Sequence, residues 1–133
     1  MNTIETLAQA SKSLLMISES DYPLEPFEEQ IQLNGELTEQ QLLQHLNYSE
    51  NTKVEIVSVD DFFRQACAEN EWQSQEEQET AKKFQSLLAI LKSQLNQLQV
   101  FRIYKTATNI EAYVLGQTLD GKVAGLKTQL VET

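Results

Sequence analysis

Few side chains in this sequence have the type and spacing that catalysis requires. The single histidine, His45, has no cysteine or second histidine near it to complete a transition-metal site. The single cysteine, Cys67, has no neighbouring histidine in the sequence that would activate it as a nucleophile. Asp60 and Asp61 could act as an acid–base pair, but a helix N-cap at Asp60 explains them more simply. Phosphate-binding loops, nucleophile elbows, zinc-protease motifs and CxxC pairs are all absent.

Three other features are more typical of binding than of catalysis. The acidic segment SESDYP, residues 18–23, is either a turn that ends a helix or a charged contact loop. The segment ENEWQSQEEQE, residues 69–79, contains the only tryptophan, Trp72, in a polar turn. A tryptophan usually belongs to a core, but an exposed one with an acidic rim is typical of an interface anchor. The third feature is the end of the sequence, where an alternating strand-like pattern continues to within two residues of Thr133.

The charge of the chain is large and uneven. Its formal net charge is −10. Residues 1–79 carry 17 acidic and 3 basic side chains, and residues 80–133 carry 3 acidic and 7 basic ones. Such a surface repels phosphate, so we expect no direct contact with nucleic acid. It is either a solvated surface that keeps the protein soluble or a surface that attracts a basic partner.

Length and composition favour one globular domain over residues 1–133. The 133 residues are 41% hydrophobic, with only 4 Gly and 2 Pro. The longest apolar run is the five-residue LLAIL at 87–91, far from the roughly 20 residues that span a bilayer. The N-terminal segment lacks the pattern of a secretory signal, and one cysteine cannot form an internal disulfide. We therefore expect a cytoplasmic protein, without membrane contact and monomeric when free.

Helix signals dominate the first two thirds of the chain. Apolar spacing predicts an amphipathic helix from residue 3 to about 16. Thr38 with Gln41, and Ser74 with Glu77, form two capping boxes. The first predicts a short helix, and the second opens the main helix, which we expect over 75–97. A short helix capped by Asp60 is predicted between them.

Strand signals dominate the last third. A weak strand is predicted at 26–33 and a buried one at 54–59. Three further segments, at 99–107, 111–118 and 122–131, are joined by turns at 108–109 and at the Asp-Gly pair 120–121. We expect these three to form an antiparallel meander, with the preceding helices packed on the sheet.

Several of these segments together resemble a known family, the nuclease A inhibitors, which act on a sugar-nonspecific nuclease. The similar segments are LLMISESDYPLE, VDDFFRQA followed by the tryptophan, AKKFQSLLAILKSQL, QVFRIYK and YVLGQTLDGKVAGLKTQLVET. Residues 32–52 depart from the family pattern. The resemblance implies an α+β fold, a three-layer α/β/α sandwich with a largely antiparallel sheet, similar to the plant pathogenesis-related class 1 fold.

The resemblance also implies a function and a set of contact residues. The chain would inhibit a divalent-metal-dependent nuclease of DNA and RNA by plugging its active site in a 1:1 complex. The family positions correspond to Glu19 in the SES loop, Trp72, the preceding acidic residue Glu71, which is usually aspartate, and Thr133. The hydroxyl and carboxylate of Thr133 would engage the catalytic Mg²⁺ or Mn²⁺ of the nuclease, so the chain would need no cofactor of its own.

Two other functions stay open on the sequence alone. An acidic adaptor or regulatory module of the same fold would bind a different basic protein. A hydrolase that uses carboxylates is the weakest alternative, because no nucleophile or metal-binding set supports it. We expect a protein that binds rather than catalyses.

Overall fold

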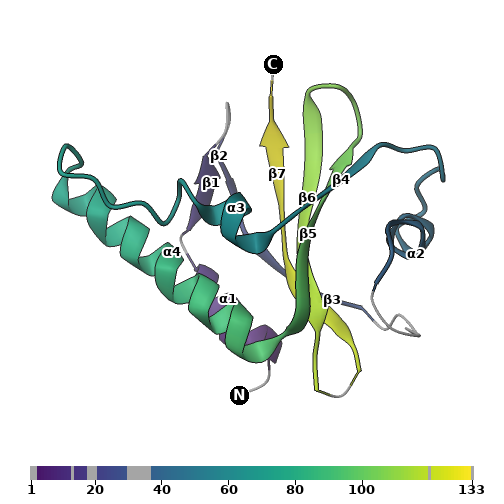
Figure 1. Ribbon diagram of the computed structural model, residues 1–133, viewed down its shortest axis with the longest axis horizontal. Coiled ribbons are helices and arrows are strands. Elements are labelled where there is room, and N and C mark those ends of the chain that lie inside the picture. Colours follow the sequence, from purple (N-terminus) through teal and green to yellow (C-terminus); the bar gives the residue numbers. More distant parts are fainter. Residues whose placement is uncertain (1–2, 13, 18–20, 30–36, 120, 133) are drawn as a thin grey trace.

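The computed structural model describes residues 3–12, 14–17, 21–29, 37–119 and 121–132. Within these ranges the order of elements, given at the end of this paragraph, has helices first and long strands last, as the sequence predicts (Figure 1). The elements are α1 (Thr3–Ser11), β1 (Leu15–Ile17), β2 (Asp21–Pro23), β3 (Glu25–Glu29), α2 (Glu39–His45), β4 (Val54–Val57), α3 (Val59–Phe63), α4 (Gln75–Gln94), β5 (Asn96–Tyr104), β6 (Asn109–Gln117) and β7 (Val123–Val131).

A five-stranded sheet in the order β3-β7-β6-β5-β4 forms the centre of the molecule. Every neighbouring pair in it is antiparallel, and β5, β6 and β7 are consecutive both in sequence and in space. The strands β1 and β2 form a separate antiparallel pair. The predicted α+β class, the largely antiparallel sheet and the C-terminal meander are therefore confirmed.

One face of the sheet is covered by α1, α3 and α4. The apolar stripe of α4 places Phe84, Leu87 and Leu91 against alternate residues of the meander, which include Val100 and Val114. These side chains are at most 3% exposed, so they form a dry core. The stripe forms because apolar residues recur at helical spacing along α4. The C-terminal end of α4 meets the sheet, whereas its N-terminal end extends away from it (Figure 1).

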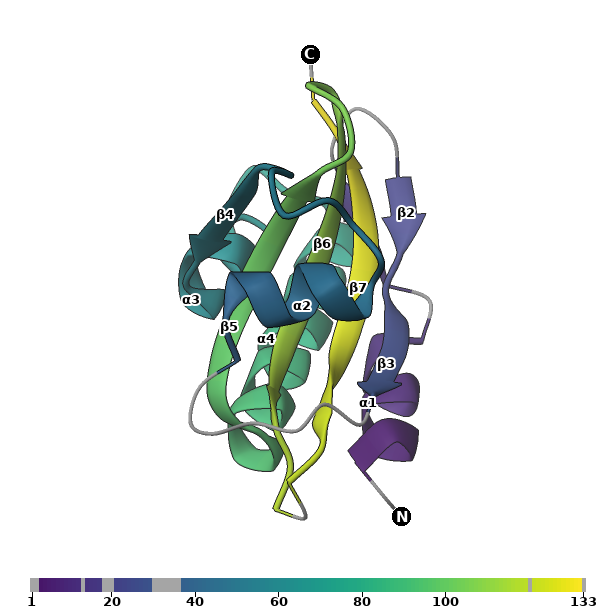
Figure 2. The same cartoon turned by 90° about the vertical axis from the view of Figure 1, so that its right-hand side faces the viewer.

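The opposite face of the sheet is covered by α2 (Figure 2). Leu42 and Leu43 from this helix pack on Phe101, Ile103 and Leu115, which point away from α4. Alternation along the strands gives each face its own apolar set, since successive side chains point to opposite sides. The finer prediction, a three-layer sandwich like the plant pathogenesis-related class 1 fold, stays a prediction.

The N-terminal helix is shorter than predicted. We expected a helix to about residue 16, but α1 ends at Ser11, and Leu15 begins the strand β1. The Ser11 hydroxyl donates to the Leu7 carbonyl at 2.7 Å, and the Leu14 amide donates to the Ser11 carbonyl. Leu14 is nevertheless buried. The helical spacing of Leu14 does not show that it belongs to the helix, because a residue just beyond the helix end can also be buried.

Both predicted capping boxes are present, whereas the predicted cap at Asp60 is wrong. The Thr38 and Ser74 hydroxyls each accept from the backbone N–H three residues later. The Gln41 and Glu77 side chains in turn accept from the backbone N–H of Thr38 and of Ser74. The N-cap of α3 is Ser58, whose hydroxyl accepts from the Asp61 N–H at 3.1 Å. The predicted strand at 54–59 consequently ends at residue 57.

Other element bounds differ by a few residues. The helix α4 ends at Gln94 rather than at residue 97, because Leu95 is already extended. The strand β3 covers Glu25–Glu29, and residues 30–33 of the predicted strand lie outside the described residues. Asn109 begins β6, so the turn predicted at 108–109 lies over 105–108. In the last hairpin Gly121 has a φ of 84°, and the Asp120 of the predicted Asp-Gly pair lies outside the described residues.

One glycine is required by close approach of backbone. A Cβ at Gly125 on β7 would lie 1.7 Å from the Val114 carbonyl oxygen on β6. No side chain can be placed there without moving one of the two central strands.

Candidate functional site

Trp72 lies in the turn between α3 and α4 and is 78% exposed. The neighbouring Glu71 is exposed too. The turn itself is well held: the Asn70 N–H donates to the Gln73 side chain at 2.9 Å, and the Gln78 amide donates to the Asn70 carbonyl at 2.9 Å. The indole is therefore presented to solvent on an ordered turn. This exposure rules out the core alternative, and the role of Trp72 as an interface anchor stays a prediction.

The start of α4 fixes where this turn ends. The Glu77 N–H donates to the Ser74 hydroxyl at 3.1 Å, and the Ser74 N–H donates to the Glu77 carboxylate at 3.1 Å. The reciprocal contacts satisfy backbone donors that a helix N-terminus otherwise leaves unpaired. The position of Trp72, two residues before the cap, follows from this local sequence.

Glu132, the residue directly after β7, is held by an arginine on β5. The Glu132 N–H donates to the Thr108 carbonyl at 2.8 Å, and its carboxylate forms an ion pair with Arg102 on β5. The other guanidinium nitrogen of Arg102 donates to Glu55 on β4 at 2.8 Å. Because β6 lies between β5 and β7, Arg102 links strands on both sides of its own. Thr133, the predicted metal-contacting residue, lies outside the described residues, directly after this clamp.

The predicted contact residue Glu19 also lies outside the described residues. The strands on either side of it are described: β1 and β2 pair with Ile17 opposite Asp21. The Thr128 hydroxyl on β7 donates to the Tyr22 carbonyl on β2 at 3.4 Å. The end of β1, the start of β2 and the end of β7 point toward the same end of the molecule (Figure 1).

A large open groove joins these regions. We call it the α3–α4 groove; its volume is about 1020 Å³. Its walls come from β1, α3, the first half of α4 and the end of β7. The lining includes Gln73, next to Trp72, and Glu132, next to Thr133. Residues adjacent to two of the predicted contact positions therefore share one concave surface. The other lining residues are Leu15, Met16, Val57, Asp61, Phe62, Gln65, Ala66, Glu76, Glu77, Thr80, Ala81, Phe84, Arg102, Leu130 and Val131.

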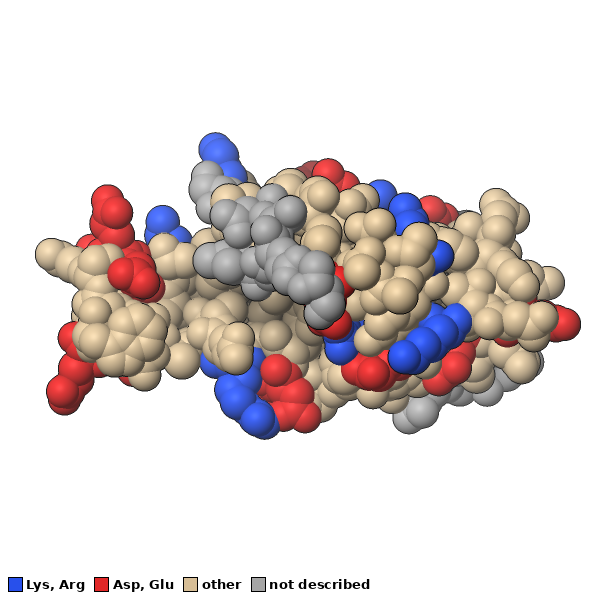
Figure 3. Space-filling model, turned by 90° about the horizontal axis from the view of Figure 1, so that it is seen from above, with Lys and Arg blue, Asp and Glu red and all other residues tan. Residues whose placement is uncertain are grey.

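Acidic side chains gather at the end of the molecule where α4 begins. Figure 3 shows red carboxylates at this end, and the exposed ones in sequence are Glu69, Glu71, Glu76, Glu77 and Glu79. Basic side chains are interspersed with acidic ones over the rest of the visible face. The uneven charge of the sequence thus becomes a local acidic surface around Trp72.

The residues considered for catalysis are scattered. His45 on α2 contacts Glu29 at 3.0 Å, and Asp60 on α3 contacts Lys92 at 2.7 Å. Burial raises the pKa of the Cys67 thiol, Asp60 adds to this effect, and Lys92 opposes it. A raised pKa disfavours the reactive thiolate. Within the described part of the chain, no three His, Cys, Asp or Glu residues are grouped as metal ligands would be.

Sequence reasoning missed a polar cluster on the α2 face. The Tyr113 hydroxyl donates to Glu111 at 2.8 Å, and Lys105 contacts the other carboxylate oxygen at 2.6 Å. Burial alone would raise the pKa of Glu111, but hydrogen bonds from Lys105, Tyr113 and Tyr48 outweigh it and lower the pKa. Alternation in β6 could have revealed the cluster, because Glu111 and Tyr113 are two residues apart and share a face.

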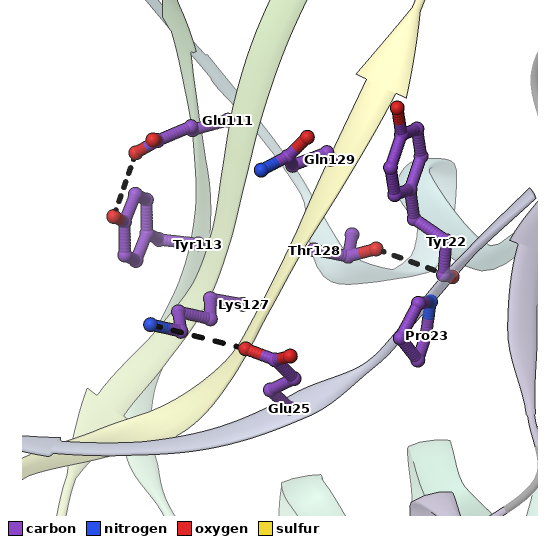
Figure 4. A pocket seen from close by; sticks show the side chains of 8 residues that line it. All are labelled: Tyr22, Pro23, Glu25, Glu111, Tyr113, Lys127, Thr128 and Gln129. Carbon is purple, nitrogen blue, oxygen red and sulfur yellow. Dashed lines mark hydrogen bonds and ion pairs between the residues drawn. The ribbon is translucent and has the colours of Figure 1, made fainter. Parts of the chain in front are cut away.

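A small pocket of about 130 Å³ lies beside this cluster. The contacts drawn in Figure 4 join several of its lining residues: Tyr113 with Glu111, Lys127 with Glu25, and Thr128 with the Tyr22 carbonyl. The remaining lining residues are Pro23 and Gln129. We interpret the cluster as a support for the sheet.

The family model of nuclease A inhibitor-like proteins matches residues 1–133, the whole chain. The chain belongs to this family, whose description indicates a nuclease-inhibitor role and implies a nuclease as the partner. A search of curated proteins found no match. No helix in the described ranges combines the length and apolar character that crossing a membrane requires.

Proposed function

We propose that this chain inhibits a sugar-nonspecific, divalent-metal-dependent nuclease by covering its active site in a 1:1 complex. The observation that carries the proposal is the shared groove: Gln73, beside Trp72, and Glu132, beside Thr133, line one surface. Contact residues far apart in the sequence can therefore meet one partner at once. Trp72 and Glu71 would contact the rim of the nuclease cleft, and Glu19 and Thr133 would enter it.

The chemistry of a nonspecific nuclease supports this assignment. An enzyme that ignores base identity recognises the phosphate backbone, so its cleft is basic. A divalent cation in such a cleft polarises a phosphoryl oxygen. Mg²⁺ and Mn²⁺ prefer hard oxygen ligands, and the carboxylate and hydroxyl of Thr133 are both of this kind. We propose that Thr133 occupies a position otherwise used by water or phosphate, with the ion supplied by the nuclease.

The clamp around Glu132 supports a fixed approach of the terminal residue. Arg102 and the Thr108 carbonyl hold Glu132 by its carboxylate and its N–H. Because Glu132 is held, Thr133, the residue directly after it, would lose less conformational entropy on binding than it would next to an unrestrained neighbour. The acidic surface near Trp72 would speed the encounter with a basic cleft, an effect that weakens as salt rises.

Inhibition of DNA and RNA cleavage by a metal-dependent nonspecific nuclease tests the proposal. The parent chain is expected to block both substrates at a 1:1 ratio. Deletion of Thr133, addition of three residues after it, and Glu19→Ala are each expected to weaken inhibition strongly. Full inhibition by the extended chain would contradict the role of the Thr133 carboxylate. Absence of inhibition by the parent, with retained binding to another basic protein, would favour the adaptor function instead.

A further inference from the structure

We infer that the α3–α4 groove is a second contact surface for the nuclease, and that it receives a segment presenting an apolar side chain flanked by lysine or arginine. The inference rests on the proposed function and adds a contact beyond Glu19, Glu71, Trp72 and Thr133. It assigns the nuclease two contacts: one inside its cleft and one on a neighbouring basic, partly apolar segment.

The floor of the groove is apolar and accessible. Leu15 on β1 is 43% exposed, and Phe62 and Ala66 are half-buried. The groove is open because the first six residues of α4 cover no core: they are exposed or half-buried, and the first buried residue is Ala81. Large accessible apolar surfaces on a monomer mark places where another molecule binds.

The rim of the groove is acidic. Asp61, Glu76, Glu77 and Glu132 all line it, and its one cation, Arg102, is bound by Glu55 and Glu132. Asp61 pairs with Arg64, and Glu77 accepts from the Ser74 N–H. Glu76 is different, because no cation among the described residues forms an ion pair with its carboxylate. A basic side chain from a partner would complement this rim.

Charge also distinguishes between the molecules that could occupy the α3–α4 groove. A second copy of this chain carries a net charge of −10 and would oppose an acidic rim. Nucleic acid is repelled for the same reason. A basic segment with an apolar residue could pack that residue on the apolar floor of the groove and pair its charges with the acidic rim. A nonspecific nuclease has basic surface around its cleft, so it is the partner that fits.

Four variants on α4 test the inference, in two matched pairs. Glu76→Lys changes a rim residue, and Glu79→Lys makes the same charge change at an exposed position of the same helix that does not line the groove. Thr80→Trp fills the groove, and Ala89→Trp adds the same bulk at an exposed position outside it. Far-UV circular dichroism establishes that each variant is folded.

Binding kinetics are measured by surface plasmon resonance against a purified nuclease that cleaves DNA and RNA and needs a divalent cation. Glu76→Lys and Thr80→Trp are expected to raise the dissociation constant at least tenfold, chiefly through faster dissociation. Glu79→Lys and Ala89→Trp are expected to change the dissociation rate less than threefold. Glu79 belongs to the acidic surface near Trp72, so Glu79→Lys should slow association as Glu76→Lys does, and the dissociation rate is the quantity compared within each pair. If the parent binds and the members of each pair behave alike, the groove contact is overturned and the proposed function stands. If the parent does not bind, the proposed function fails, and the groove contact fails with it.

Discussion

Arg102 forms ion pairs with Glu132 and with Glu55, so one guanidinium links the last described residue of the chain to the edge strand β4. The Arg102 side chain is only 16% exposed, and its guanidinium lies 5.7 Å from the Tyr104 ring centre. Partial burial strengthens such contacts relative to those on the open surface. Together with the hydrogen bond from the Glu132 N–H to the Thr108 carbonyl, the arrangement gives the residue after β7 a defined position.

Replacement of this arginine should weaken both inhibition and stability. Arg102→Met keeps the aliphatic stem but releases Glu132, so we expect about a tenfold loss of nuclease affinity and about 1–2 kcal/mol of unfolding free energy. Lys105→Met is the matched control, because Lys105 pairs with Glu111 on the opposite face. It should lose comparable stability and keep its affinity. Calorimetric titration and urea unfolding measure the two quantities; equal affinities for the two variants would contradict a positioning role.

Trp72 should contribute to binding and not to folding. Its side chain is 78% exposed, so Trp72→Ala should leave the urea midpoint unchanged. If it is a binding hot spot, the complex should weaken by about 2–4 kcal/mol. Leu119, 97% exposed in the β6–β7 turn, is a control for loss of exposed apolar surface. Leu119→Ala should change neither quantity, and a dissociation constant unaffected by Trp72→Ala would refute the anchor.

Stability should depend on the ionisation of Glu111 in acid. Its pKa is lowered in the folded state, so the charged form stabilises the fold above the ordinary glutamate pKa of about 4.3. That contribution is lost as the pH falls through the folded-state pKa. Glu111→Gln should therefore cost about 1 kcal/mol at pH 7 and progressively less below about pH 4. Urea unfolding at pH 7 and pH 3 checks this, with exposed Glu79→Gln as the control; a difference between Glu111→Gln and parent that does not vary with pH would exclude it.

Gly125 should not tolerate a side chain. A Cβ would overlap the Val114 carbonyl oxygen at 1.7 Å, so Gly125→Ala must displace β6 or β7 and should cost about 3 kcal/mol or more. Gly121 is a useful contrast, because its φ is 84° but nothing lies within 4 Å of its added Cβ. Gly121→Ala should cost only about 1 kcal/mol of strain. Thermal unfolding followed by circular dichroism ranks the two, and the reverse order would be inconsistent with the structure.

The elements predicted best are those that short stretches of sequence determine. The capping boxes at Ser74 and Thr38 each depend on four consecutive residues, and the meander on alternation and short turns. The end of α1 was wrong because tertiary contacts decided it, whereas the cap of α3 was decided locally, by a serine two residues before the predicted cap. Leu14 is buried by packing beyond the helix, and Ser58 competed with Asp60 as a cap.

The candidate site also has a part that the sequence predicts and a part that it does not. The exposure of Trp72 follows from its polar neighbours and the adjacent cap, and the sequence predicts it. The α3–α4 groove and the Arg102 clamp require β1, α3, α4 and β7 to meet, and no local pattern contains that information. Glu55 and Glu132 are 77 positions apart and share one arginine.

The exposed indole is also an intrinsic fluorescent probe of binding. Trp72 is the only tryptophan, so all indole emission comes from one position on the proposed interface. In the free protein that fluorophore is already in water, and thermal unfolding will barely shift its emission. Burial against a partner will shift the emission to shorter wavelength. In this chain, intrinsic fluorescence is therefore a probe of association and a poor probe of folding.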